Sequence, residues 1–186
     1  ASNGGNGIYM EGNTTNGEVY LAMGANAAEI ANGSPLTNDF PTELVGLLPA
    51  GDIVVNDNDQ NGIAIQANGH NGILTWIADV TANGNDANGI NAQFISDGGW
   101  VNAFFEDITA NANGANGLRA NVKTVGPGGA WVFLTVSNSV ANGNTADGFS
   151  VDAVATGNAA QVFFDNVTAI TNAGDGIDVA ATAGGA

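Results

Sequence analysis

Hydrophobic and polar residues alternate along most of this chain. After several glycines every second residue is apolar, as in Ile63, Ile65 and Ala67, and a second such run ends just before an Asp or Asn. A third, shorter run follows that Asp or Asn. A period of two is typical of β-strands, whereas glycine, asparagine and β-branched residues are weak helix formers. We therefore predict three short strands joined by turns, and no long helix, in each alternating unit.

The alternating units repeat along the chain. An Asn-Gly or Asp-Gly pair opens each clear copy, and the glycines Gly62, Gly89, Gly117, Gly148 and Gly176 lie 27, 28, 31 and 28 residues apart. Asn32-Gly33 and Asn6-Gly7 extend the series toward the N-terminus. A fixed period of this length is the signature of a solenoid. We expect about six coils of about 28 residues, followed by a partial one.

Polar positions keep the same phase as the glycines. One column lies three residues before each pair and consists of Asn58, Asn85, Asn113, Asn144 and Asn172. A second lies five residues before and consists of Asn56, Asn83, Asn111 and Asn142. A third lies nine residues before and consists of Asp52, Asp79, Asp107, Asn138 and Asn166. In a parallel stack, equivalent residues lie directly above one another. We predict that these columns form hydrogen-bonded ladders, satisfy buried turn amides and tolerate left-handed backbone at turns.

The pattern predicts one all-β domain over residues 1–186, a parallel β-solenoid with three strands per coil. Neighbouring coils would lie about 4.8 Å apart. Residues 34–50 interrupt the repeat with three prolines and no alternation. We expect this segment to be an elaboration of the second coil, with a short helical turn or a distorted strand.

Composition narrows the possible partners. The chain has 18 acidic and 2 basic residues, a formal net charge of −16 and no cysteine. Neutralising phosphates needs many Lys and Arg, so binding to nucleic acid or to an anionic membrane surface is excluded. No apolar run approaches the roughly 20 residues of a membrane span. Without cysteine there are no disulfides and no thiolate metal sites.

Each repeat unit begins with Asn/Asp-Gly and an apolar alternation, and continues with a strand ending in Asp/Asn and a Val-Thr-Ala-x-x-Asn segment. This unit resembles the right-handed parallel β-helix repeats of the pectin-lyase-like superfamily. It is most similar to repeats of acidic, cysteine-free bacterial surface proteins. The resemblance implies a right-handed β-helix and an extracellular or cell-surface location. It implies no single activity, because this fold carries lyases, hydrolases, adhesins and tail spikes.

Enzymes of this superfamily usually work on the outer face of the first strand. There the sequence places Gln93, Asn121, Asp152 and Asp178, of which the two carboxylates suggest glycoside hydrolysis. No cluster of several Asp with a nearby Arg or His recurs on this face, and the only histidine, His70, has no nucleophile motif. We therefore expect no enzyme, with a polysaccharide-binding or polysaccharide-cleaving protein as the alternative.

Calcium is a candidate cofactor at one acidic turn. Asp57, Asp59 and Asn61, followed by Gly62, match the first half of an oxygen-ligand calcium loop. The closing Glu is missing, because the twelfth position is Asn68. The alternative is that both carboxylates are solvated turn residues and that Asn61 belongs to a ladder.

Large apolar residues also occupy outward positions of the second strand. This aromatic stripe consists of Leu74, Trp76, Trp100, Phe104, Trp131, Phe133 and Phe163. An exposed stripe of this size is unusual in a soluble monomer. It would be covered by residues 34–50, form a subunit interface or stack on sugars.

The chain enters in repeat register and leaves after a first strand, without a polar cap. Isolated solenoids need caps, and open strand edges pair with other edges. We therefore expect a segment of a longer solenoid, or subunits that form a homo-polymer by head-to-tail or lateral association. The corresponding function is that of an extracellular structural protein in a bacterial surface filament, surface layer or adhesin.

Overall fold

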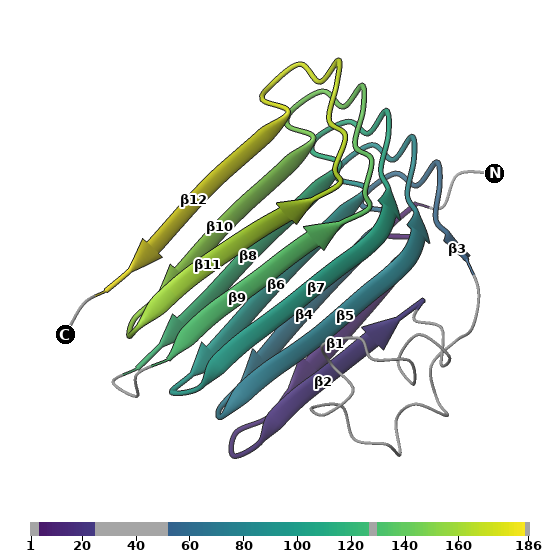
Figure 1. Cartoon of the computed structure of the whole chain (residues 1–186). Helices are drawn as coiled ribbons and strands as arrows, with labels where there is room; N and C mark the ends of the chain where they lie inside the picture. Colours follow the sequence, from purple (N-terminus) through teal and green to yellow (C-terminus); the bar gives the residue numbers. More distant parts are fainter. Residues whose placement is uncertain (1–3, 25–51, 127–129, 185–186) are drawn as a thin grey trace.

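The computed structural model describes residues 4–24, 52–126 and 130–184, and all regular structure within them is β (Figure 1). No helix that could cross a membrane occurs in these ranges. The strands are β1 Ile8–Asn13, β2 Glu18–Met23, β3 Ile53–Val54, β4 Ile63–Gly69, β5 Gly72–Thr81, β6 Ile90–Asp97, β7 Trp100–Thr109, β8 Leu118–Val125, β9 Trp131–Ser137, β10 Phe149–Ala155, β11 Ala159–Asp165 and β12 Ile177–Ala183.

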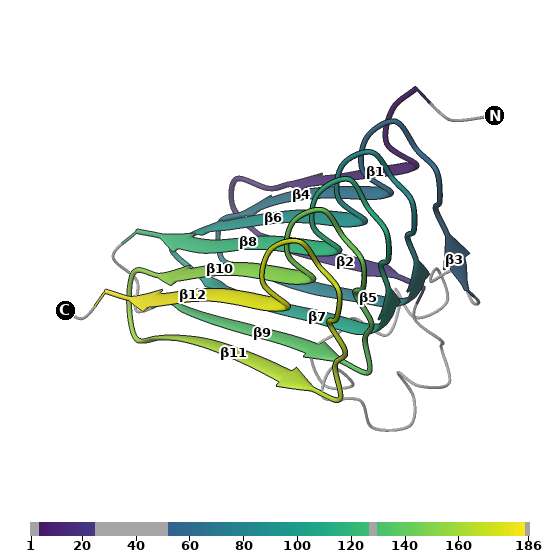
Figure 2. The same ribbon diagram turned by 90° about the horizontal axis from the view of Figure 1, so that it is seen from above.

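Two parallel sheets face each other across the core (Figures 1 and 2). The first sheet has the order β1-β4-β6-β8-β10-β12 and the second has the order β11-β9-β7-β5-β2. The chain passes from one sheet to the other and then moves up by one coil, in the right-handed sense (Figure 1). The predicted all-β parallel solenoid is therefore confirmed, with about five turns in the described residues.

The third face of each coil is much shorter than the other two. Only Val80 and Thr81, at the end of β5, pair with β3, while farther along the solenoid the face shrinks to single bridges of Val140 with Thr109 and Thr168. Left-handed residues make the corner before this face, at the column Asp79, Asp107, Asn138 and Asn166, with φ values of 54, 52, 50 and 50°. Asp and Asn tolerate this conformation better than other side chains do. The predicted turn role of this column is confirmed.

The first two long strands of the first sheet are direct neighbours, although the sequence places a further repeat between them. Ile8 of β1 pairs directly with Ile63 of β4, so no strand lies between them in the first sheet. Asn32-Gly33, which we expected to open the second coil, and the elaboration at 34–50 lie outside the described residues. The described residues therefore form about five turns, with β1 and β4 as direct neighbours in the first sheet.

The core is a stack of identical positions. In the first sheet one inward column runs Ile8, Ile63, Ile90, Leu118, Phe149 and Ile177. The four central members are fully buried, and full burial of such a side chain contributes roughly 1.5–3 kcal/mol. Phe149 also meets Phe164 of the second sheet edge-on, with ring centroids 6.0 Å apart. Repetition of one apolar set thus holds the two sheets together.

Close stacking explains the glycine that follows each Asn. A Cβ at Gly62 would lie 2.7 Å from the carbonyl oxygen of Gly89 and 2.8 Å from the side-chain nitrogen of Asn85. Gly89 meets the next coil in the same way. Neither glycine has a positive φ, so left-handed freedom is not the reason for this column. The column is glycine because successive coils leave no room for a side chain.

Candidate functional site

The buried asparagine column forms a continuous ladder through five coils. Each side-chain amide donates to the carboxamide oxygen of the next coil, with N···O distances of 2.7 Å (Asn58 to Asn85), 3.0 Å (Asn85 to Asn113), 3.1 Å (Asn113 to Asn144) and 3.0 Å (Asn144 to Asn172). The backbone N–H of each lower residue donates to the same oxygen. The second amide hydrogen of Asn113 reaches the carbonyl oxygen of Ala82. The carboxamides thereby satisfy buried turn groups that would otherwise be unpaired.

The asparagines of the Asn-Gly pairs form a second ladder with the opposite polarity. Here the upper residue donates: the side-chain amides of Asn61, Asn88 and Asn116 donate to the coil below at 3.0, 2.9 and 3.1 Å. Asp147 and Asp175 continue the column, and each donates its backbone N–H to the residue below at 2.9 Å. The predicted ladder of the Asn58 column is therefore confirmed, and the asparagines of the Asn-Gly pairs form a further structural ladder.

The aromatic stripe has the predicted register across coils. Val101 pairs with Val132, so Trp100 and Trp131, one residue earlier in each strand, belong to the same column. Trp76 pairs with Phe104, and Thr135 stands between Phe104 and Phe163. The indole of Trp100 lies over Gly72, where a Cβ would come within 2.6 Å of the ring. The stripe is therefore a continuous outer face of the second sheet.

The stripe is divided into a buried and an exposed part. Leu74, Trp76 and Ala78 of β5 are buried in an outer cluster, and Tyr20, Ala22, Trp100 and Phe104 pack against it. The indole N–H of Trp76 has no hydrogen-bond partner in the described part of the chain. Cover by residues 34–50, one of the three expected explanations, lies outside the described residues. Leu74 and Trp76 are thus not available at the surface.

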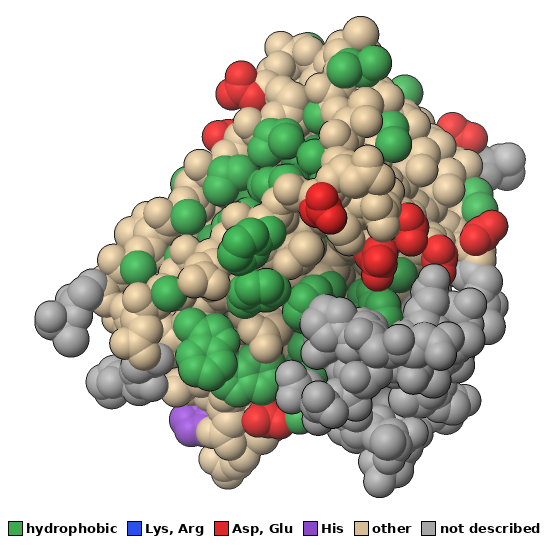
Figure 3. Space-filling model, viewed as in Figure 1, with side chains coloured by type: hydrophobic (Ala, Val, Ile, Leu, Met, Phe, Trp, Pro, Cys, Tyr) green, Lys and Arg blue, Asp and Glu red, His purple; other side chains and the backbone are tan. Residues whose placement is uncertain are grey.

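The other part of the stripe remains open. Trp131 and Phe163 are 47% and 49% exposed, and green side chains gather over the second sheet in Figure 3. Phe133 links Phe163 to Phe104, because its ring centroid lies 5.7 Å from that of Phe104 and 5.2 Å from that of Phe163. The indole N–H of Trp131 points to the carboxamide oxygen of Asn102 at 3.4 Å. Aromatic faces and amide groups therefore lie side by side on this surface.

On the first sheet the outward residues occupy the predicted columns. Asp152 pairs with Asn121 below and Ala180 above, and Asp178 pairs with Ser150. Both carboxylates are exposed, as are Gln93, Arg119 and Lys123. Within the described residues neither Arg119 nor Lys123 forms an ion pair with a carboxylate. In the described ranges no cation pairs with either carboxylate, and their catalytic role stays a prediction.

At the N-terminal end of the same face, Tyr9 and Glu11 interact. The Tyr9 hydroxyl donates to a Glu11 carboxylate oxygen at 3.2 Å. Loss of hydration, followed by the hydrogen bond with Glu11 and its charge, raises the pKa of Tyr9 above its usual value. The tyrosine is largely exposed, so this pair is a surface feature of β1.

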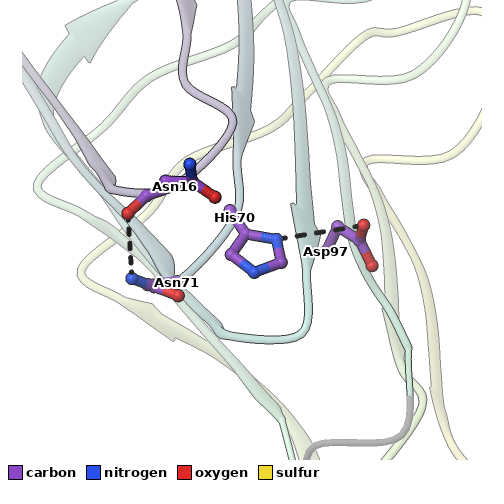
Figure 4. Close-up of polar contacts among 4 residues, drawn as sticks. All are labelled: Asn16, His70, Asn71 and Asp97. Carbon is purple, nitrogen blue, oxygen red and sulfur yellow. Dashed lines mark hydrogen bonds and ion pairs between the residues drawn. The ribbon is translucent and has the colours of Figure 1, made fainter.

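His70 lies in the turn between β4 and β5, where its Nδ1 is 4.0 Å from an Asp97 carboxylate oxygen (Figure 4). Both side chains are largely exposed, so their interaction is screened by water. Neighbouring Asn71 donates its side-chain amide to the backbone oxygen of Asn16 at 3.4 Å (Figure 4). His70 is therefore an exposed turn histidine.

The predicted calcium residues lie near one turn but differ in availability. Asp57 and Asp59 are exposed, whereas the carboxamide oxygen of Asn61 already accepts hydrogen bonds from the backbone and side chain of Asn88. The described residues contain no cluster of three or more His, Asp or Glu suited to hold a metal ion. Asn61 is a ladder member, as the alternative interpretation has it, and calcium binding stays a prediction.

The edge formed by β11 and β12 exposes the apolar interior. Ile177 and Val179 of β12 are 41% and 42% exposed, whereas their partners in β10, Phe149 and Val151, are 0% and 2% exposed. In the described residues β12 pairs only with β10, and β11 pairs only with β9. The alternation of β12 predicts this apolar edge, because its inward positions match those of the buried strands.

Comparison of the chain with protein-family models, with curated proteins and with solved structures finds no match.

Proposed function

We propose that this chain is an extracellular structural protein, a β-solenoid subunit or segment of a bacterial surface filament, surface layer or adhesin. It would associate through its open coil edge and the exposed part of its aromatic stripe. The observation that carries the proposal is the edge at β11 and β12, where an apolar core column and unpaired strand groups face outward together. Such an edge is a template for a further strand.

Two features support a structural rather than a catalytic role. The polar residues that recur in every coil are used in ladders, so they are committed to holding coils together. The net charge of −16 keeps soluble chains apart and so opposes uncontrolled aggregation. Association would then depend on the pairing of complementary strand edges rather than on non-specific hydrophobic contacts. An acidic, cysteine-free solenoid is consistent with a place outside the cell.

A matched pair of variants on β12 tests the association. Val179→Asp places a charge in the inward column, whereas Ala180→Asp places the same charge one residue away on the outward face. We expect light scattering and negative-stain microscopy to show oligomers or filaments for the parent chain and for Ala180→Asp. Val179→Asp should shift the population to monomers. A parent chain that stays monomeric at high concentration would contradict the proposal.

A second candidate function, glycan binding, is favoured by the exposed aromatic residues. Trp131 and Phe163 present open ring faces, and Asn102 and the exposed Gln161 supply amide groups beside them. Flat aromatic faces with adjacent hydrogen-bonding groups suit neutral sugars, and the outer face carries no cation for an anionic ligand. This candidate uses the second sheet, in place of the first-sheet face around Asp152.

The glycan candidate is tested by affinity electrophoresis in gels that contain neutral polysaccharides. We expect Trp131→Ala to lose the retardation that the parent chain shows. Tyr9→Ala is the matched control, because Tyr9 is an equally exposed aromatic residue on the first sheet. Equal retardation of all three proteins would exclude the second-sheet face, and no retardation of the parent would exclude the function.

A further inference from the structure

Asn-Gly pairs are chemically reactive, and this chain contains twelve of them. The backbone nitrogen of the glycine can attack the side-chain carbonyl carbon of the asparagine, which forms a succinimide ring and releases ammonia. Water then opens the ring and leaves aspartate or isoaspartate. The reaction requires a free glycine N–H and a side chain that can rotate onto it. Whether each pair reacts therefore depends on how the fold holds these two groups.

In most pairs the coil-to-coil hydrogen bonds hold the glycine nitrogen. The N–H groups of Gly62, Gly89 and Gly117 donate to carbonyl oxygens of the next coil at 3.0, 3.0 and 3.1 Å. The N–H groups of Gly7, Gly84 and Gly143 also donate to the next coil, and that of Gly114 donates to the carbonyl oxygen of Asn85 in the preceding coil. The asparagines before Gly62, Gly89 and Gly117 are also fixed in the second ladder. Attack at these pairs would first require local opening of a coil.

Two further pairs lie at the ends of paired strands. Gly69 ends β4 and Gly72 begins β5, and both glycines are buried. The side-chain amides of Asn68 and Asn71 are hydrogen-bonded, to Asn13 at 2.7 Å and to Asn16 at 3.4 Å. Strand pairing and these bonds restrain both reacting groups.

Asn16-Gly17 differs from the other described pairs. It lies in the turn between β1 and β2, where the Asn16 side chain is exposed. Within the described residues neither the Asn16 carboxamide nor the Gly17 N–H has a hydrogen-bond partner; the backbone carbonyls of these residues accept the bonds from His70 and Asn71 (Figure 4). The electrophile and the nucleophile are thus both free.

We propose that Asn16 is a selective site of spontaneous deamidation, and that the folded solenoid protects its other described Asn-Gly pairs. Conversion adds a carboxylate to the β1–β2 turn. Isoaspartate also lengthens the backbone by one methylene group before Gly17, whose carbonyl oxygen accepts the N–H groups of His70 and Asn71 at 3.2 and 3.1 Å. The modification therefore loosens the contact between the first two turns at this end of the solenoid.

Peptide mapping by mass spectrometry tests the proposal on the full 186-residue chain, incubated at mildly alkaline pH in its folded state. We expect Asn16 to convert at least about tenfold faster than any ladder asparagine, because those sites must open first. Asn142-Gly143 is the sharpest internal control. Gly143 is exposed like the turn at Asn16, but its N–H donates to the carbonyl oxygen of Ile170 at 3.0 Å.

Two further measurements distinguish the effect of the fold on the deamidation rate from the effect of the local sequence. In concentrated urea all Asn-Gly pairs should react at similar rates, because every pair has the same residue after the asparagine. In folded Gly17→Ala, conversion at Asn16 should slow while the other sites are unchanged; the new Cβ would lie 3.2 Å from the Thr14 hydroxyl, which can rotate away. The proposal is overturned if folded Asn142 reacts as fast as Asn16, or if Asn16 keeps its lead in urea.

Discussion

At the scale of single residues, the turns of this solenoid impose one backbone conformation on whatever side chain stands there. Asp57, Gly84, Ala112, Gly143 and Thr171 are equivalent positions of successive coils, and all have a left-handed φ between 55 and 65°. Glycine adopts this conformation without cost, whereas alanine and especially threonine do not. The column therefore contains two strained members.

Ala112→Gly should relieve this strain. At φ 55° the Ala112 Cβ crowds the following carbonyl oxygen, so we expect the free energy of unfolding to rise by about 0.5–1 kcal/mol. Chemical denaturation measures the change. Ala115→Gly, in the same turn but without a positive φ, is the control and should lower stability by a similar amount. A loss of stability in both variants would show that Ala112 is not strained.

A buried hydroxyl supplies a second test at this scale. Thr75 is fully buried in β5, and its hydroxyl has no hydrogen-bond partner in the described chain. Thr75→Val keeps the shape and removes the unsatisfied group, so stability should rise by about 1 kcal/mol. Thr124 is equally buried, but its hydroxyl accepts the N–H of Thr156 at 3.0 Å. Thr124→Val should therefore be destabilising, and the same sign for both variants would contradict the argument.

At the scale of elements, the ladders decide how firmly one coil holds the next. Asn113 accepts two hydrogen bonds from Asn85, donates to Asn144 and donates to the carbonyl oxygen of Ala82. Asn113→Ala leaves several buried groups unpaired, so we expect a loss of about 3 kcal/mol in thermal or denaturant unfolding. Asn172→Ala should cost less, because water reaches that rung. Equal losses at both positions would mean that burial does not set the strength of the ladder.

At the scale of elements, the sequence predicts the strands and their register but not what packs on their outer faces. The alternation and the in-phase asparagines predict the two long sheets, their register and the ladders, because each coil repeats the same local sequence pattern. Which part of the aromatic stripe is buried could not be predicted, since the pattern of one strand does not say what packs on its outer face. The described residues form about five turns where the sequence predicts about six, since Ile8 pairs directly with Ile63. The expected second coil at Asn32-Gly33 lies outside the described residues.

At the scale of the whole molecule, stability should vary along the solenoid axis. Each coil contacts only its neighbours, so a strand with partners on both sides opens less often than an edge strand. Hydrogen exchange should therefore be slowest in β6, β7 and β8 and fastest in β12, whose residues are all exposed. Uniform protection in all strands would contradict this nearest-neighbour description.

The same exchange measurement, repeated at low and high protein concentration, tests how the open edge is used. If copies of the chain cover β12, the amides of β12 and β11 should gain protection as concentration rises, while those of β6 and β7 should not change. Val179→Asp should abolish the gain, because it places a charge in the apolar column that a further strand would cover. Ala180→Asp should preserve it. If protection at β12 does not depend on protein concentration, this edge is not an interface between copies of the chain.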